Sequence, residues 1–302
     1  MTLFTRILFF GFCGILAGVL AWPLIELVLY FQAAIPTLLL LNITLGVAAG
    51  VFMGGGFGAS EGIISRSWVK IRNGILTGLV IGVVAGAVGF IAGQAALLFL
   101  GTVIFHSAYS VQRIGFPISR SIGWALFGLC IAMVHGIRSL SWAKIRNGVI
   151  GGLCGGFIGG LVVEYLNVFT PFAWYARLCG FGVLGLLIGI FYGIVENRLS
   201  RASLLLLGGK SKNREFLITQ KVTNIGASPK TEIGIEGYRG TSGVHTMITR
   251  ERGEYLLTDA GSKTGTYVND EKIRSRKLKD GDVIRMGDAQ FLFRERGGRV
   301  DQ

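Results

Sequence analysis

Apolar residues fill long, almost uninterrupted runs in the first two hundred positions of the chain. Six of these runs are each long enough to cross about 30 Å of hydrocarbon as a helix. They lie at 7–31, 37–60, 75–104, 119–137, 148–168 and 177–196. We therefore predict an all-α bundle of about six transmembrane helices over residues 1–201. The first helix is the least regular, because Pro23 interrupts it and Glu26 adds a charge.

The pattern changes after Arg201 to short segments with a high content of β-branched and aromatic residues, separated by polar turns. Many strands of about five residues with polar turns are typical of a β-sandwich. We predict an all-β domain over residues 202–297, followed by a short tail at 298–302. The predicted strands are Ser203–Leu207, Glu215–Thr219, Val222–Ile225, Glu232–Ile235, His245–Arg250, Glu254–Thr258, Thr266–Asn269, Asp282–Arg285 and Gln290–Arg294.

An internal repeat runs through the helical half. The segment from Ser67 to Gly74 recurs from Ser141 to Gly148 with a single difference, at the third position. Glycines follow at every fourth position in both copies, at 74, 78, 82 and 86 and at 148, 152, 156 and 160. We infer a tandem two-helix repeat near 46–100 and 120–168.

The regular spacing of glycines has a structural consequence. A helix with glycine at every fourth position presents one smooth face, and in lipid such faces allow helix backbones to approach closely. A further stripe precedes the first copy, at 46, 50, 54, 58 and 62. The stripes predict tight packing, either within the chain or between copies in a homo-oligomer.

Polar residues within the apolar runs are few. A transport path would need such groups near the middle of the bilayer, and the candidates are Gln94, Glu164, His135 and Glu61. We expect Glu61 and His135 near the cytoplasmic ends of their helices, and Glu26 and Glu164 toward the outer ends. A relay through the centre is therefore not predicted, and a channel or transporter is the less favoured alternative.

Charge and composition support a membrane protein and indicate its orientation. Hydrophobic residues make up 51% of the chain and charged residues 16%, which is too apolar for one soluble globule. Basic residues occur in the alternate segments 61–74 and 138–147, and Arg198 and Arg201 follow the last run. Because basic residues favour the cytoplasmic side, we predict cytoplasmic N- and C-termini in a bacterial inner membrane or a plasma membrane.

Other function classes receive no support from the sequence. Lysines and arginines of the C-terminal half alternate with acidic residues, so nucleic-acid binding is not expected. The four cysteines lack metal-ligand spacing, and the three histidines are scattered. Because no P-loop, kinase or hydrolase motif occurs, we expect no catalytic residue, no metal and no cofactor, and predict that the chain is not an enzyme.

Four motifs follow one another in the C-terminal half. They are Ile225-Gly226, Ser242-x-x-His245, the segment from Gly261 to Asn269, and the segment from Lys279 to Gly287. In this order they resemble the forkhead-associated (FHA) family, over about residues 203–296. The resemblance implies a β-sandwich whose loops, at one end, bind a phosphothreonine in a partner protein.

The resemblance also implies roles for individual residues. Ser242 would donate a hydrogen bond to the phosphate, and Gly265 would occupy a turn that requires a positive φ angle. His245, together with Gly226, would brace the binding loops.

Two positions depart from the pattern of the FHA family. Ala227 stands where the family has a phosphate-binding arginine, and Thr264 stands where it has an asparagine that holds the peptide. A missing charge-assisted hydrogen bond costs about 1.5–3 kcal/mol. Positive charge and donors from neighbouring loop residues would replace it: Ser228, Lys230, Arg239 and Lys263. The predicted phosphopeptide-binding residues are therefore Ser242, Lys263, Thr264, Ser228 and Arg239.

Together these features predict a membrane-anchored FHA adaptor or scaffold. It would recruit a threonine-phosphorylated protein to the membrane in Ser/Thr kinase signalling. One alternative is a structural membrane scaffold with a degenerate FHA-like domain that binds its partner without phosphate. The other is the channel or transporter, regulated by that domain.

Overall fold

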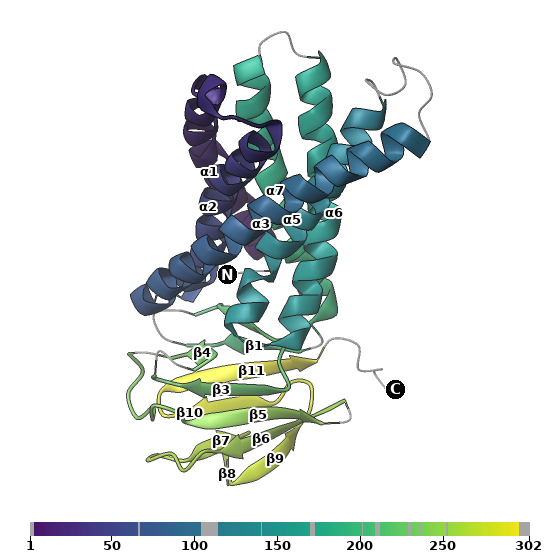
Figure 1. Ribbon diagram of the computed structural model, residues 1–302. Coiled ribbons are helices and arrows are strands. Elements are labelled where there is room, and N and C mark those ends of the chain that lie inside the picture. The colour runs from purple at the N-terminus through teal and green to yellow at the C-terminus, as the bar shows by residue number, and fades with distance from the viewer. Residues whose placement is uncertain are drawn as a thin grey trace. The chain divides into compact units, whose positions relative to one another are not determined.

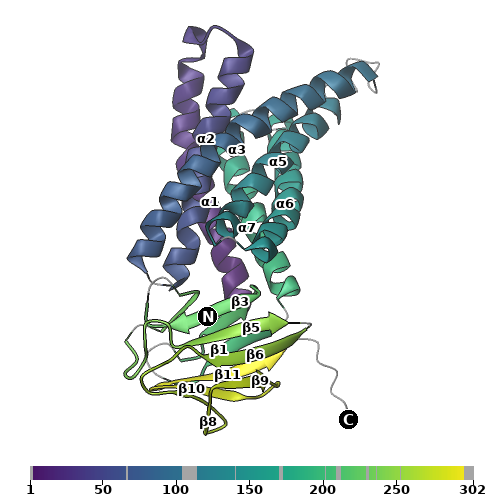
Figure 2. The same cartoon turned by 60° about the horizontal axis from the view of Figure 1, so that its bottom comes forward.

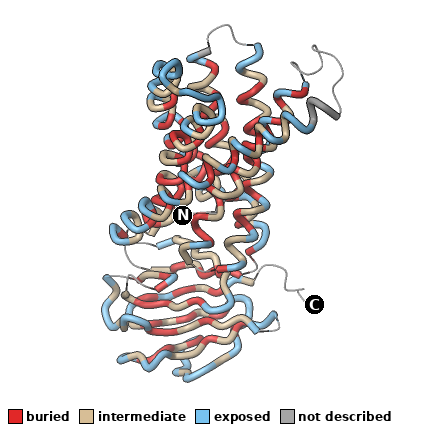
Figure 3. Tube along the Cα trace, in the orientation of Figure 1, coloured by how far each residue is buried: buried red, intermediate tan, exposed pale blue. Residues whose placement is uncertain are grey.

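The structure is a computed structural model that describes residues 3–65, 67–103, 114–139, 141–169, 173–200, 202–208, 212–228, 231–235, 237–251 and 253–295. The predicted tail at 298–302 and Lys230 lie outside these ranges. The chain divides into two compact units, a helical unit from Arg6 to Glu196 and a C-terminal unit that contains every strand described. Each unit has its own hydrophobic core, as Figure 3 shows by burial (Figures 1 and 3).

Over the residues that the structure describes, the helical unit contains six long helices, one for each predicted run (Figure 1). All six are long and apolar enough to cross a membrane. Their bounds are α1 (Leu3–Tyr30), α2 (Leu38–Ser65), α3 (Trp68–Val103), α5 (Phe116–Arg138), α6 (Trp142–Phe169) and α7 (Ala173–Leu199), with a short 3-10 turn η1 (Gln32–Ala34) between the first two.

Two helices begin earlier than the apolar runs predicted. The basic segments 61–74 and 138–147 lie outside the predicted apolar runs, yet α3 starts at Trp68 and α6 at Trp142. The carbonyl oxygens of the preceding serines, Ser67 and Ser141, accept hydrogen bonds from the amides four residues on, at 3.0 and 2.9 Å. The lysines and arginines of the repeat therefore lie in the first turns of helices.

Glycine faces pack at least three pairs of helices against one another. At the closest points a methyl group on one glycine would overlap the carbonyl oxygen of the glycine opposite, so no larger residue fits without a shift. The facing pairs are Gly54 with Gly78 in α2–α3, Gly128 with Gly152 in α5–α6, and Gly14 with Gly185 in α1–α7. The stripes are thus occupied within the chain, and their use between copies stays a prediction.

Each of these helix pairs is also joined by a polar contact toward the end remote from the basic segments. Two helix pairs have an acidic residue in that contact, and the third has two amides. The contacts are Arg177 with Glu26 (2.7 and 2.8 Å), Arg120 and Trp124 with Glu164 (3.2 and 3.1 Å), and Asn42 with Gln94 (3.4 Å). The polar groups considered for a transport path therefore link helices here.

Polar contacts also link the helices at the basic end, where Glu61 and His135 were expected. Each contact connects two helices, and together the contacts involve α1, α2, α5, α6 and α7. They are Arg6 with Glu196 (two hydrogen bonds of 3.0 Å), Lys144 with Glu61 (2.5 Å), and His135 Nε2 with Ser60 Oγ (2.9 Å). Pairing matters at this site, because an unpaired buried charge is strongly destabilising.

The C-terminal unit is a sandwich of two sheets that lie face to face (Figures 1 and 2). Their strand orders are β2-β1-β11-β10-β7-β8 and β4-β3-β5-β6-β9. The strands are β1 (Ala202–Leu206), β2 (Glu215–Ile218), β3 (Val222–Gly226), β4 (Ile233–Gly234), β5 (Thr246–Glu251), β6 (Glu254–Asp259), β7 (Thr266–Val268), β8 (Glu271–Ile273), β9 (Ser275–Leu278), β10 (Val283–Met286) and β11 (Ala289–Glu295).

The predicted β-sandwich is confirmed, and two of its strands were missed. β8 and β9 lie in the stretch from Glu271 to Leu278, which is rich in charge and lacks the alternation of apolar residues that marks a half-buried strand. Each is the last strand of its sheet. Edge strands tolerate charged side chains, so their sequence carries a weak strand signal.

Candidate functional site

Hydrogen bonds link four loops at one end of the sandwich. The loop after β3 bonds to the loop before β5, from the amides of Ala227 and Ser228 to the carbonyls of Ser242 and Gly243, at 2.9 and 3.0 Å. Two further bonds connect the loop before β5 to the loops before β7 and after β10: Thr264 Oγ1 to Gly240 O (2.7 Å), and the Asp288 amide to Arg239 O (3.1 Å). All five predicted binding residues lie in these linked loops.

The hydroxyl of Ser242 is held in place but keeps its proton for a ligand. Its oxygen accepts a hydrogen bond of 3.1 Å from the amide of Lys263. Among the described residues the hydroxyl donates to no protein acceptor. The serine is half-buried, whereas Lys263 is exposed beside it. A directed hydroxyl donor in a loop bonded to one that carries an exposed lysine is suited to binding an anion.

Arg239 brings a guanidinium group to the same end of the sandwich. It precedes Gly240, the glycine that accepts the hydrogen bond from Thr264, and it is exposed. Gly240 has a φ of 74°, which glycine adopts without the steric cost that other residues incur. Arg239 and Lys263 thus place two basic residues in the loops linked to Ser242, while Ala227 contributes no charge. Lys230, a further predicted source of charge, lies outside the described residues.

Thr264 is used differently from the asparagine whose place it takes. Its hydroxyl donates to the carbonyl of Gly240, at 2.7 Å, and so ties two loops together. The proton of this hydroxyl is therefore not available to a peptide, although the oxygen can still accept a hydrogen bond.

His245 braces the loops from a fully buried position. Its Nδ1 accepts a hydrogen bond from the amide of Ser242 (3.1 Å), and its Nε2 lies 3.2 Å from the carbonyl of Gly265. Because an amide only donates and a carbonyl only accepts, the ring is neutral with its proton on Nε2. Gly265 has a φ of 81°, and a methyl group at Gly226 would overlap the carbonyl of Gly243.

Asp259 organises the loop that carries Lys263 and Thr264, and the sequence reasoning missed it. Its carboxylate accepts hydrogen bonds from the amides of Gly261 and Ser262 (3.1 Å each) and from the hydroxyls of Ser262 and Thr266 (2.6 Å each). Burial raises the pKa of Asp259, but these hydrogen bonds outweigh it and hold the pKa below its ordinary value. An aspartate directly before Ala-Gly-Ser is a signal for an Asx turn, so the sequence offered a clue.

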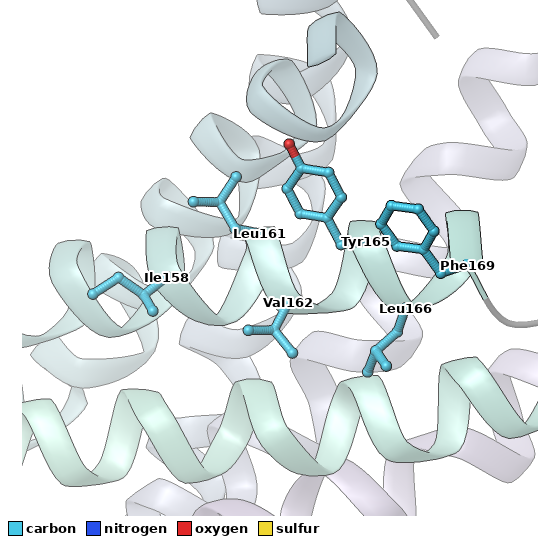
Figure 4. A pocket seen from close by; sticks show the side chains of 6 residues that line it. All are labelled: Ile158, Leu161, Val162, Tyr165, Leu166 and Phe169. Atoms are coloured by element: carbon cyan, nitrogen blue, oxygen red, sulfur yellow. The ribbon is translucent and has the colours of Figure 1, made fainter. Parts of the chain in front are cut away.

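Two further features of the described residues bear on metal and ligand binding. Over these residues no group of three or more His, Cys, Asp and Glu side chains is placed to hold a metal ion. A hollow of about 330 Å³ lies on one helix, and its lining is wholly apolar (Figure 4). The side chains that line it all come from α6: Ile158, Leu161, Val162, Tyr165, Leu166 and Phe169.

Comparison with known families decides what the sandwich is. Residues 223–287 match the family described as the FHA domain. These residues form an FHA domain. The match includes every predicted binding residue, and the family is one of phosphothreonine-binding modules. The helical unit lies outside the matched residues.

Two curated relatives each match about a third of this chain. The glycogen accumulation regulator GarA of Mycolicibacterium smegmatis is 33% identical over 100 residues, which are 33% of this chain and 63% of that protein. The oxoglutarate dehydrogenase inhibitor of Corynebacterium efficiens is 33% identical over 92 residues, 30% of this chain and 64% of that protein. The chain thus spans less than two thirds of the length of either relative.

Solved FHA structures are similar over the same part. The FHA domain of FhaA, crystallised in complex with the intracellular domain of Rv3910, is 28% identical and covers 31% of this chain and 99% of that chain, with a TM-score of 0.29. A second structure, from work on phosphothreonine-dependent FHA interactions, is also 28% identical; it covers 32% of this chain and 96% of that chain, with a TM-score of 0.29.

Proposed function

We propose that this protein is a membrane-anchored adaptor that recruits a threonine-phosphorylated protein to the bilayer. The FHA domain binds the phosphothreonine, and the helical unit fixes the place of binding. The protein acts by recruitment and not by catalysis. Ser/Thr kinase signalling is the process that supplies such a partner.

The geometry around Ser242 carries the proposal. Its hydroxyl is oriented by the Lys263 amide, retains a proton, and lies among loops that also present the cations of Lys263 and Arg239. A phosphate group in this position accepts from the hydroxyl and from both cations. Each such charge-assisted bond contributes about 1.5–3 kcal/mol. Lysine and arginine thereby take over the role of the arginine that the family has at Ala227.

Two features support the membrane part of the proposal. Six described helices are long and apolar enough to cross a bilayer, and basic residues lie in alternate segments near their ends. Because basic segments favour the cytoplasmic side, both termini and the FHA domain face the cytoplasm, where protein kinases act.

A second candidate function follows from Thr264 and Ala227. Since the threonine hydroxyl is committed to Gly240 and Ala227 has no charge, the same loops are also compatible with a partner that carries no phosphate. In that case the protein is a structural scaffold, and its FHA domain is a phosphate-independent interaction module.

A peptide-binding experiment separates the two. The fragment 197–302 has its own hydrophobic core, so it is suited to expression alone. It is incubated with a library of threonine-phosphorylated peptides and their unphosphorylated twins. Preference for the phosphorylated members, lost in Ser242→Ala, supports the adaptor. Equal binding of both members by a folded fragment refutes it in favour of the scaffold.

A further inference from the structure

The repeat places an indole and a guanidinium together on two helices. Trp68 and Arg72 are four residues apart in the first turns of α3, and Trp142 and Arg146 are four residues apart in the first turns of α6. Residues four apart lie on the same face of a helix. Both indoles are strongly exposed, at 76% and 78% of their full area, and both arginines are exposed as well.

The two arginines have no acidic partner among the described residues. The acids at the same end of the helices, Glu61 and Glu196, are bound by Lys144 and Arg6 respectively. The amides at the start of a helix add partial positive charge to that of the side chains. Each helix start is therefore a cationic patch beside an exposed tryptophan, and its charge is not balanced within the described part of the protein.

An apolar stripe continues from each arginine along the same helix face. Leu76 and Val80 follow Arg72 at steps of four residues and are exposed. Ile150 follows Arg146 in the same way and is exposed too. A cation followed by exposed aliphatic side chains complements an amphiphile that has an anionic head and an acyl chain.

We propose that these pairs form two equivalent binding sites for the head group of an anionic phospholipid. The guanidinium of Arg72 or Arg146 binds the phosphate, the indole lies at the level of the head groups, where tryptophan is favoured, and the acyl chains cover the aliphatic stripe below. The proposal rests on the proposed insertion of the helical unit into a membrane. It assigns a lipid preference to the duplicated segment, which serves no role in phosphopeptide binding.

Native mass spectrometry of the full-length protein in detergent tests the proposal. The protein is titrated with dioleoylphosphatidylglycerol or with dioleoylphosphatidylcholine, and the retained lipids are counted. We expect two preferentially retained phosphatidylglycerol molecules. Because a basic residue beside an anionic lipid changes affinity about fivefold, Arg72→Gln and Arg146→Gln each weaken one site by about that factor, and the double variant loses the preference.

Arg198→Gln is the matched control, since Arg198 belongs to the last turn of α7 and has an isoleucine, not a tryptophan, four residues before it. It retains both lipids if the pairs form the sites. Equal retention of the two lipids, or an equal loss in Arg198→Gln, overturns the proposal. So does displacement of phosphatidylglycerol by inorganic phosphate alone, which would indicate a small-anion site.

Carbonate extraction of membranes distinguishes failure of the lipid-site proposal from failure of the proposed membrane anchoring. If the protein is released by carbonate, the membrane anchor itself is refuted. If it stays in the membrane and shows no head-group preference, only the lipid sites are refuted. Circular dichroism of the purified variants confirms that their helices are intact.

Discussion

Ser242 is the residue on which the proposed phosphate recognition depends most. Two hydrogen bonds fix its position. The amide of Lys263 donates to the hydroxyl oxygen of Ser242, and the amide of Ser242 donates to Nδ1 of His245. The family's arginine is absent at Ala227, and the loss of one charge-assisted bond corresponds to a roughly ten- to hundredfold weaker complex. In the proposed function Arg239 and Lys263 offset this loss, although a lysine acts as a point charge and lacks the fork of an arginine.

If Arg239 and Lys263 replace the charge of the family's arginine at Ala227, each of them should contribute to phosphopeptide affinity. Substituting either by glutamine removes one cation from the site, and we expect about tenfold weaker binding of a phosphopeptide. Binding of the unphosphorylated twin should stay the same. Isothermal titration calorimetry of fragment 197–302 measures both.

Lys277→Gln is the control for these variants, because Lys277 is exposed on β9 and pairs with Glu254. It removes the same charge outside the four binding loops. Unchanged phosphopeptide affinity in both Arg239→Gln and Lys263→Gln would contradict the replacement of the missing arginine.

Asp259 predicts how stability depends on pH. Its pKa in the folded domain lies below the ordinary value of 3.8, so the unfolded chain binds the proton more tightly. The stabilisation is therefore fully present above the unfolded pKa, from about pH 5, and is lost as the pH falls through the folded pKa. We expect Asp259→Asn to lower the free energy of unfolding at pH 7 and to flatten its decrease below pH 5.

Urea titrations of fragment 197–302 between pH 2 and 7 check this expectation. Asp288→Asn makes the same charge change at an exposed position and serves as the reference. If the free energy of unfolding depends on pH in the same way in both variants, the hydrogen bonds to Asp259 are not the cause of the pH dependence.

Single residues show where sequence reasoning succeeds and where it stops. The loop-bracing place of His245 and the turn at Gly265 could be expected, because the motif fixes their spacing. The hydrogen bond from Thr264 to Gly240 joins residues 24 positions apart, so it depends on how two loops meet. Residue pattern alone does not contain that information.

At the level of elements, the helical unit is built from facing glycines. Where Gly54 meets Gly78, a methyl group would overlap a carbonyl oxygen. Helices in lipid associate mainly through such close packing, since lipid tails are as apolar as the side chains. The spacing of four residues is thus a requirement of the contact between α2 and α3.

This contact gives a prediction with an internal control. Gly54→Ala should force α2 and α3 apart and cost about 1–3 kcal/mol, as overpacking of a core does. Gly182→Ala meets only Val19, at 3.7 Å, and should be neutral or stabilising because alanine favours the helix. Thermal unfolding of the full-length protein in detergent compares them, and equal unfolding temperatures would show that the glycine faces are not tightly packed.

The elements themselves were largely predictable. Apolar length marked all six helices, and turn residues marked most strands. The early start of α3 was not visible, because Lys70 and Arg72 lie outside the apolar run, yet polar residues are equally able to form a helix. The ion pair of Arg6 with Glu196 joins residues 190 positions apart, and no local pattern indicates it.

At the level of the whole molecule, the proposed function combines a membrane anchor, the helical unit, with a phosphothreonine-binding FHA domain. It requires that the FHA domain and the basic ends of the helices face the same compartment. A green fluorescent protein fused after residue 302 should therefore fluoresce in cells, and alkaline phosphatase at the same place should be inactive. A phosphatase fused after Ile35, between α1 and α2, should be active. The opposite result at both places would reverse the topology.

Recruitment of a phosphothreonine peptide to vesicles tests the central claim most directly. The full-length protein is reconstituted in phosphatidylcholine vesicles, a peptide selected with fragment 197–302 is added, and vesicle-bound peptide is measured by flotation. The account predicts micromolar binding that weakens at least about tenfold after phosphatase treatment of the peptide, and equally in Ser242→Ala. Binding that is unchanged by phosphatase would contradict it, and would assign the protein to phosphate-independent scaffolding.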